Sequence, residues 1–116
     1  MKLSSILIGI TFLIYSCGNN SSSLNHKADY TKSMVTALIE IPSGSLEKWE
    51  LNKNTGIIER DSIGKQPRTI DYLGYPANYG MIPGTILTKT NGGDGDPLDV
   101  LVLGSPLEKG TLIKCN

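Results

Sequence analysis

Glycine and proline divide this sequence into short apolar runs, and that spacing limits the fold more than any other feature. The chain holds 13 Gly and 6 Pro among 116 residues. Such frequent turn residues indicate short strands joined by tight turns and disfavour a helical bundle. The sequence therefore predicts one mainly β domain, a small barrel or a sandwich.

Three strands are expected in the first half of the domain. Residues 34–41 (MVTALIEI) form an apolar run that ends at a Pro-Ser-Gly-Ser turn. Residues 48–51 (KWEL) alternate charged with apolar side chains, which is the period of a half-buried strand. The turn at residues 52–56 (NKNTG) joins this strand to a third one beginning at Ile57, so a hairpin is predicted.

The second half predicts loops and two further strands. Residues 61–67 are polar and are expected to form a loop. Residues 72–85 (YLGYPANYGMIPGT) contain too many Gly and Pro residues for a helix, so we expect an ordered loop with short extended pieces. Residues 98–103 are continuously apolar after Asp99, which predicts a strand buried on both faces. Residues 111–114 begin another strand.

Composition excludes several common classes of function. The 11 basic and 11 acidic side chains give a formal net charge of zero, which provides no electrostatic footprint for nucleic acid. The single histidine, His26, lies in a polar N-terminal stretch, so a Ser-His or Cys-His hydrolase and an ordinary zinc site are not expected. Cys17 and Cys115 are too few for a disulfide framework, and Cys115 is expected to be a small buried apolar residue.

The first 17 residues resemble a bacterial lipoprotein signal. Lys2 precedes an apolar stretch at residues 6–15, and Ser16 precedes Cys17. The resemblance implies lipidation at Cys17 and a flexible tether at residues 18–33 before the domain at residues 34–116. It predicts a membrane-anchored lipoprotein, periplasmic or at the cell surface, with contact to the membrane only through that lipid. An uncleaved hydrophobic N-terminus or a misassigned start codon remains the alternative.

Three aspartates crowd the stretch GGDGDPLDVLVLG at residues 92–104. An EF-hand is excluded, because Leu98 and Asp99 occupy positions where that loop needs a ligand and a glycine. Asp94 and Asp96 are two residues apart, so in an extended segment their side chains point the same way. A site built from carboxylates alone suits a hard cation such as Mg²⁺ or Mn²⁺. The other interpretation of this stretch is a solvated acidic turn.

Other side chains that could hold a phosphate ligand lie elsewhere in the chain. Lys48 and Glu50 share one face of the expected strand, with Glu40 on the strand before. Arg68 and Tyr79 lie in the loops that lead to the aspartates. Phosphate ligands need such cations and donors beside a metal.

Five motifs in this order resemble the soluble, single-domain, Mg²⁺-dependent inorganic pyrophosphatases. The similarity runs from about Val35 to Asn116, and the D-G-D-P-L-D-V motif is highly specific for the family. It implies a small closed or partly open five-stranded, OB-like β-barrel that hydrolyses pyrophosphate to two phosphates. The motifs are IEIPSGS (39–45), KWEL (48–51), GKQPR (64–68), YPANYG (75–80) and DGDPLDVLVLG (94–104).

The resemblance also implies roles for the three aspartates. Asp94 and Asp99 match metal-binding carboxylates, with Asp99 bridging two ions. Asp96 matches the carboxylate that takes a proton from the attacking water, whose pKa two or more Mg²⁺ ions (or Mn²⁺) would lower.

Further roles follow from the other motifs. Lys48, Arg68 and Tyr79 match groups that hold the phosphates. Arg60 competes with Arg68 for the guanidinium role, and the spacing from Arg68 to YPANYG favours Arg68. The remaining members of the active cavity are Glu40, Glu50 and Tyr75.

The family carries further metal-binding aspartates and a lysine at positions after Asn116. The sequence therefore predicts the N-terminal part of a pyrophosphatase domain, as a fragment or a truncated product, which could form homo-oligomers when full length. The family resemblance favours a cytoplasmic enzyme, in conflict with the lipoprotein signal, and both localisations stay open. The alternative functions are a non-catalytic surface lipoprotein whose acidic turn binds divalent cations and a chain that does not fold stably.

Overall fold

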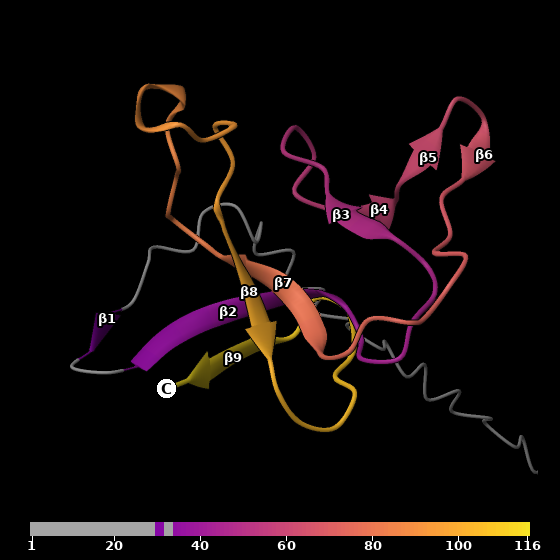
Figure 1. The fold of residues 1–116 in the computed structure, drawn as a ribbon. Helices are drawn as coiled ribbons and strands as arrows, with labels where there is room; N and C mark the ends of the chain where they lie inside the picture. The colour runs from indigo at the N-terminus through magenta and orange to yellow at the C-terminus, as the bar shows by residue number, and fades with distance from the viewer. Residues whose placement is uncertain (1–29, 32–33) are drawn as a thin grey trace, which may run out of the picture.

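The computed structural model describes residues 30–31 and 34–116, and nearly all of its regular structure is β (Figure 1). The predicted signal at residues 1–17 and most of the predicted tether lie outside the described residues. No helix in the described part of the chain is long and apolar enough to span a membrane. The elements are β1 (Tyr30–Thr31), β2 (Met34–Ile41), β3 (Trp49–Leu51), β4 (Ile58–Arg60), β5 (Ser62–Ile63), β6 (Gln66–Pro67), β7 (Asn78–Ile82), the 3₁₀ helix η2 (Lys89–Asn91), β8 (Leu98–Val102) and β9 (Leu112–Cys115).

One five-stranded antiparallel sheet carries the fold, with β2 as its central member. The order is β1-β2-β7-β8, and β9 also pairs with β2. The hairpins β3–β4 and β5–β6 form two separate two-stranded sheets to one side (Figure 1). The sheets do not close into a barrel within the described residues, so the mainly β, partly open architecture expected from the sequence is confirmed.

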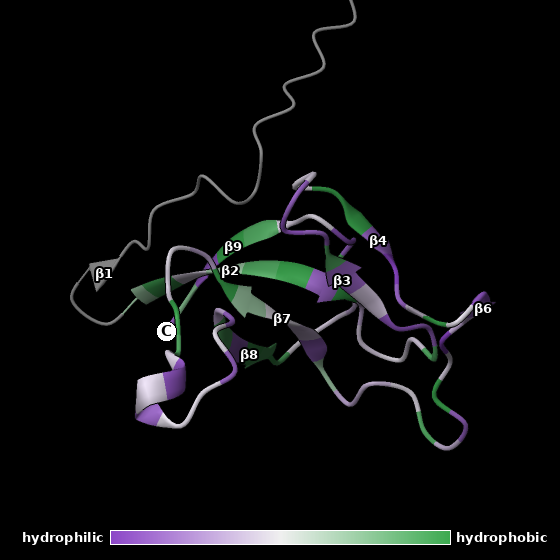
Figure 2. Ribbon diagram, turned by 90° about the horizontal axis from the view of Figure 1, so that it is seen from above, coloured by the Kyte–Doolittle hydropathy of each residue, from purple (hydrophilic) through white to green (hydrophobic). Residues whose placement is uncertain are grey.

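β2 is buried on both faces from Thr36 onward, because its alternate side chains enter two different clusters. Figure 2 shows this strand as hydrophobic along most of its length. One cluster lies against β8 and β9, and the other faces the β3–β4 hairpin. The first contains Ala37, Ile39 and Val102, and the second contains Leu38, Leu51 and Met81.

A β-bulge interrupts the pairing of β2 with β7 at Glu40. Ile39 pairs with Gly80 and Ile41 pairs with Tyr79, so Glu40 is the extra residue. Bulges bend a strand locally and redirect its side chains. Gly80 permits the close approach at this point, because a Cβ there would collide with the backbone of Leu38.

Asn78 joins three segments through a fully buried side chain. Its Oδ1 accepts hydrogen bonds from the backbone N–H groups of Ser43 (3.1 Å) and Leu107 (2.8 Å). Its Nδ2 donates to the carbonyl oxygens of Val102 (3.2 Å) and Ser105 (3.0 Å). All four hydrogen-bonding positions of the amide are therefore used.

Two local expectations differ from the structure, whereas residues 72–85 form a loop with one short extended piece, β7, as expected. Residues 61–67 form the β5–β6 hairpin around Gly64 at φ 66°. β8 is not buried on both faces, since Leu98 is 42% and Leu101 is 55% exposed. It pairs only with β7, and within the described residues one of its faces packs on the core while the other borders solvent.

Candidate active site

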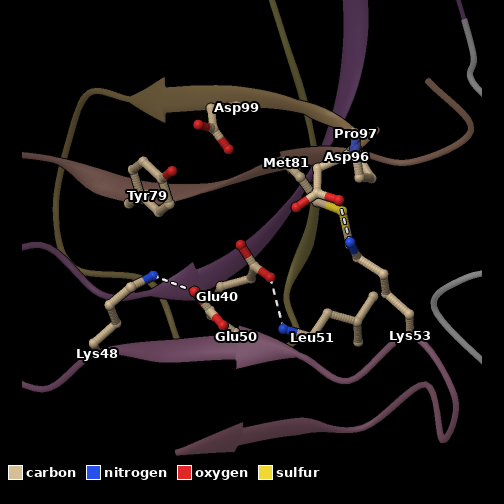
Figure 3. Close-up of a pocket in the computed structure, with 10 residues that line it drawn as sticks. All are labelled: Glu40, Lys48, Glu50, Leu51, Lys53, Tyr79, Met81, Asp96, Pro97 and Asp99. Carbon is tan, nitrogen blue, oxygen red and sulfur yellow. Dashed lines mark hydrogen bonds and ion pairs between the residues drawn. The ribbon is translucent and has the colours of Figure 1, made fainter. Parts of the chain in front are cut away.

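Polar side chains from β2, the β3–β4 hairpin, β7 and the start of β8 converge on one cleft (Figure 3). The apolar part of its lining is formed by Leu51, Met81 and Pro97. These side chains are distant in sequence and meet because β7 is paired to both β2 and β8. The polar residues that line the cleft are Glu40, Lys48, Glu50, Lys53, Tyr79, Asp96 and Asp99.

Glu40 is a buried carboxylate at the base of the cleft, only 8% exposed. Its Oε1 accepts a hydrogen bond of 2.8 Å from the backbone N–H of Leu51. Burial raises the pKa of Glu40, and the Leu51 hydrogen bond opposes that change only in part. The bulge of β2 thus places a carboxyl group of reduced acidity in the cleft.

Lys48 and Glu50 form an ion pair on the β3 wall, with 2.5 Å between Nζ and Oε1. This confirms that the two side chains share one face, as the KWEL alternation predicts. Burial is the largest single influence and acts to lower the pKa of Lys48, but the hydrogen bond to Glu50 and the charges of Glu50 and its other acidic neighbours together outweigh it, so the pKa is raised. The ammonium group therefore remains charged inside the cleft.

Tyr79 lines the opposite wall on β7. Burial raises its pKa, and the negative charge of Asp99 on the neighbouring strand raises it further, so the phenol stays protonated as a hydrogen-bond donor. Tyr75 is not part of the cleft lining but packs on Tyr79, with ring centroids 5.4 Å apart. It supports the wall from behind.

The three aspartates do not all line the cleft. Asp96 and Asp99 line the cleft, whereas Asp94 does not. The expectation that Asp94 and Asp96 point the same way is wrong, because Gly95 has φ 94° and the segment is a turn, not an extended strand. Asp94 instead accepts a hydrogen bond of 2.9 Å at Oδ1 from the backbone N–H of Asp96. Its carboxylate fixes the turn that presents Asp96.

Neither candidate arginine lines the cleft. The Arg68 guanidinium contacts Asp61 at 3.1 Å. The Arg60 guanidinium contacts Glu47 at 2.6 Å and lies 5.5 Å from the ring centroid of Trp49. The two arginines also contact each other, because Arg60 donates from Nε and Nη2 to the backbone carbonyl oxygen of Arg68.

Lys53 is a cleft residue that the sequence did not single out. It lies in the turn between β3 and β4, and its ammonium group forms an ion pair with Oδ1 of Asp96. The residues are 43 positions apart. The alternation of KWEL extends only to residue 51, so nothing in the sequence indicates this contact.

The donor chemistry of the cleft suits a hard cation, since four carboxylates line it. Within residues 30–31 and 34–116, however, no three acidic or other ligand side chains are grouped closely enough to hold a metal as they stand. Lys48 and Lys53 each engage one of the carboxylates, Glu50 and Asp96. Metal binding would therefore require these side chains to rearrange.

Comparison with known proteins supports one family. The inorganic pyrophosphatase family model matches residues 37–116. Campylobacter jejuni inorganic pyrophosphatase is 40% identical over 82 residues, which cover 70% of this chain and 42% of that protein. Chlamydomonas reinhardtii soluble inorganic pyrophosphatase 2 is 42% identical over 78 residues, covering 67% and 35%. The chain thus spans about two fifths of the length of the curated relatives it matches.

Solved structures show the same fold. Inorganic pyrophosphatase from Thermus thermophilus superposes with a TM-score of 0.60 at 33% identity, covering 80% of this chain and 48% of that one. A vacuolar soluble pyrophosphatase from Trypanosoma cruzi, solved in complex with PPi, has a TM-score of 0.67 at 23% identity and covers 78% and 38%. The second likeness concerns the fold alone.

Proposed function

The chain belongs to the inorganic pyrophosphatase family, and from this premise we propose that it contributes the catalytic cleft of an enzyme that hydrolyses pyrophosphate to two phosphates. The observation that carries the proposal is the convergence of Lys48, Tyr79 and Asp96 on one cleft from segments distant in sequence. A phosphoric anhydride needs cations, a hydrogen-bond donor and a proton acceptor in one place.

The proposed roles follow from the position of each group. Water supplies the oxygen that bonds to phosphorus, Asp96 takes its proton, and the leaving phosphate keeps the electron pair of the bridging oxygen. Lys48 and Tyr79 hold phosphate oxygens, because one is a charged donor and the other a protonated phenol. Arg68 is the proposed guanidinium contact, with Arg60 as the alternative, and either would have to leave its present carboxylate partner.

We propose Mg²⁺ as the natural cation, with Mn²⁺ able to replace it. Asp99 and, after the turn rearranges, Asp94 are the proposed ligands, while Glu40 and Glu50 contribute negative charge nearby. A bound cation would neutralise phosphate charge and acidify a coordinated water. Oxygen-only donors are what both ions prefer.

The test is phosphate release from pyrophosphate by a full-length version of the protein in the presence of Mg²⁺. Asp96→Asn should lower kcat by about 10²- to 10⁴-fold, the range for loss of a general base. Lys48→Ala should raise KM, and Lys65→Gln, in the β5–β6 turn outside the cleft, serves as the matched control. Equal, measurable rates for the full-length wild type and its Asp96→Asn variant would refute the assignment.

The alternative function, a cation-binding surface protein without turnover, makes a different prediction. Calorimetry would then show Mg²⁺ or Ca²⁺ binding that is indifferent to pyrophosphate and to Lys48→Ala. Binding coupled to pyrophosphate favours the enzyme.

We also propose that Cys17 carries a lipid anchor. Support comes from the sequence pattern alone, an apolar stretch at residues 6–15 followed by Ser16 and Cys17. Metabolic labelling with a fatty acid should mark the wild-type protein and not Cys17→Ser. Equal absence of label from both proteins would favour the cytoplasmic alternative.

A further inference from the structure

The ion pair between Lys53 and Asp96 crosses the mouth of the cleft. Lys53 comes from the β3–β4 turn and Asp96 from the acidic loop before β8. Figure 3 shows the two side chains reaching toward each other from opposite walls. Through this pair the β3–β4 turn holds the carboxylate that we assign to proton transfer.

The β3–β4 turn gives Lys53 a fixed base. Asn52 and Ile57 are joined by a backbone hydrogen bond of 2.8 Å, and Gly56 donates to the Asn52 carbonyl at 2.7 Å. The Asn52 side chain accepts from the backbone N–H groups of Asn54 (2.9 Å) and Thr55 (3.3 Å). These hydrogen bonds hold the backbone on both sides of Lys53.

Asp96 is likewise held by hydrogen bonds of the acidic loop before β8. The Asp96 carbonyl accepts from the backbone N–H of Leu87, and Gly95 donates to the Leu87 carbonyl, each at 2.9 Å. The Asp96 N–H donates to Asp94 at 2.9 Å. Two rigid turns thus bring an ammonium group and a carboxylate together.

From this geometry we propose that Lys53 is a positioning residue that reserves Asp96 for proton transfer by preventing it from binding a metal ion. The proposal rests on the proposed function for the role of Asp96. Asp96 lies two residues from Asp94 and three from Asp99, the proposed metal ligands. A carboxylate there would bind a cation as readily as its neighbours unless something occupied it.

Lys53 occupies it in two ways. Its ammonium group contacts Oδ1, which would block bidentate coordination and leave only Oδ2 to accept a proton. Its positive charge also repels a divalent ion from this carboxylate. Both side chains are about half exposed, so the effect on cation affinity is modest.

The test is Mn²⁺ binding by electron paramagnetic resonance, a readout that does not depend on turnover. Lys53→Gln should bind Mn²⁺ about fivefold more tightly than wild type. Lys53→Arg, which keeps the charge and the hydrogen bond, should behave like wild type. In the Asp96→Asn background, Lys53→Gln should change the affinity no further, because the freed carboxylate is absent. Lys65→Gln is the matched control for loss of one surface lysine.

Three results would overturn the proposal: equal Mn²⁺ affinity in wild type and Lys53→Gln, an undiminished effect in the Asp96→Asn background, or no Mn²⁺ binding by either protein. In the activity assay, Lys53→Gln should lower kcat and leave KM for pyrophosphate little changed, with rescue by Lys53→Arg. A full-length version that binds Mn²⁺ as expected but does not hydrolyse pyrophosphate would refute the proposed function, and the binding comparison would still decide the role of Lys53.

Discussion

At the scale of single residues, Asn78 is a side chain on which the fold depends. Asn78→Ala would leave two N–H groups and two carbonyl oxygens without this partner; the bond to Val102 is buried and the other three are partly buried. Since an unsatisfied buried group costs about 1–3 kcal/mol and partly buried groups can turn to water, we expect a loss of about 1–3 kcal/mol in the free energy of unfolding. Urea denaturation measures it. Asn91→Ala, at the exposed end of η2, is the control, and similar losses for both variants would contradict this role.

Glu40 should make stability depend on pH. Its pKa is raised above the ordinary value of 4.5, chiefly by burial, so the folded state holds this proton at a pH where the unfolded chain has lost it. The contribution of Glu40 to stability is therefore full below the ordinary pKa and is lost as the pH rises through the folded-state pKa.

Glu40→Gln removes the ionisable group, and with it the loss of stability at high pH, and it keeps an acceptor for the Leu51 N–H. With a chelator present, we expect the variant to unfold at a higher temperature than wild type at about pH 8, with the advantage vanishing near pH 4. Glu108→Gln, at an exposed position, should show no such pH-dependent difference. The same difference in melting temperature between wild type and Glu40→Gln at every pH in this range would contradict the burial of an ionised group.

At the scale of elements, the bulge between β2 and β7 requires glycine at position 80. Gly80→Ala would drive a Cβ into the Leu38 carbonyl, a backbone group that cannot move without breaking the sheet. We expect a cost of about 2 kcal/mol or more, as for other forced overpacking. Gly110→Ala is the control, since no atom lies within 4 Å of its Cβ position and only the strain of φ 84° applies. Denaturation should rank Gly80→Ala as clearly the less stable variant.

The β3–β4 hairpin is joined to the loop before β9 through Trp49. The Lys109 ammonium lies 2.9 Å from the ring centroid, and Arg60 lies on the same ring at 5.5 Å. Because Trp49 is the single tryptophan of the chain, its fluorescence reports this contact. Lys109→Ala should change the emission and cost about 0.5–1 kcal/mol. Unchanged emission would show that the loop does not cover the ring in solution.

The sequence was informative where local pattern decides structure, as in β2 and the β3–β4 hairpin. It failed for β8, because a continuous apolar run does not reveal how many neighbours cover a strand, and Leu101 is exposed on an edge. It failed for the orientation of Asp94, because the positive φ of Gly95 turns the chain between the two aspartates. Lys53 was missed because its partner lies far along the chain.

At the scale of the whole molecule, the cleft exists only because four separate segments meet. β2 brings Glu40, β3 brings Glu50, β7 brings Tyr79, and the start of β8 brings Asp99. The family motifs predicted this set of residues, but their meeting follows from the β2-β7-β8 order of the sheet. The chain spans about two fifths of the curated relatives it matches, so its own activity has to be measured directly.

The most direct measurement is the initial rate of phosphate release from pyrophosphate as Mg²⁺ is titrated into a full-length version of the protein, with Asp96→Asn run in parallel. We predict that the rate rises from zero with Mg²⁺, saturates, and is lost in the variant. No phosphate release by the full-length protein at any Mg²⁺ concentration would contradict the proposed function.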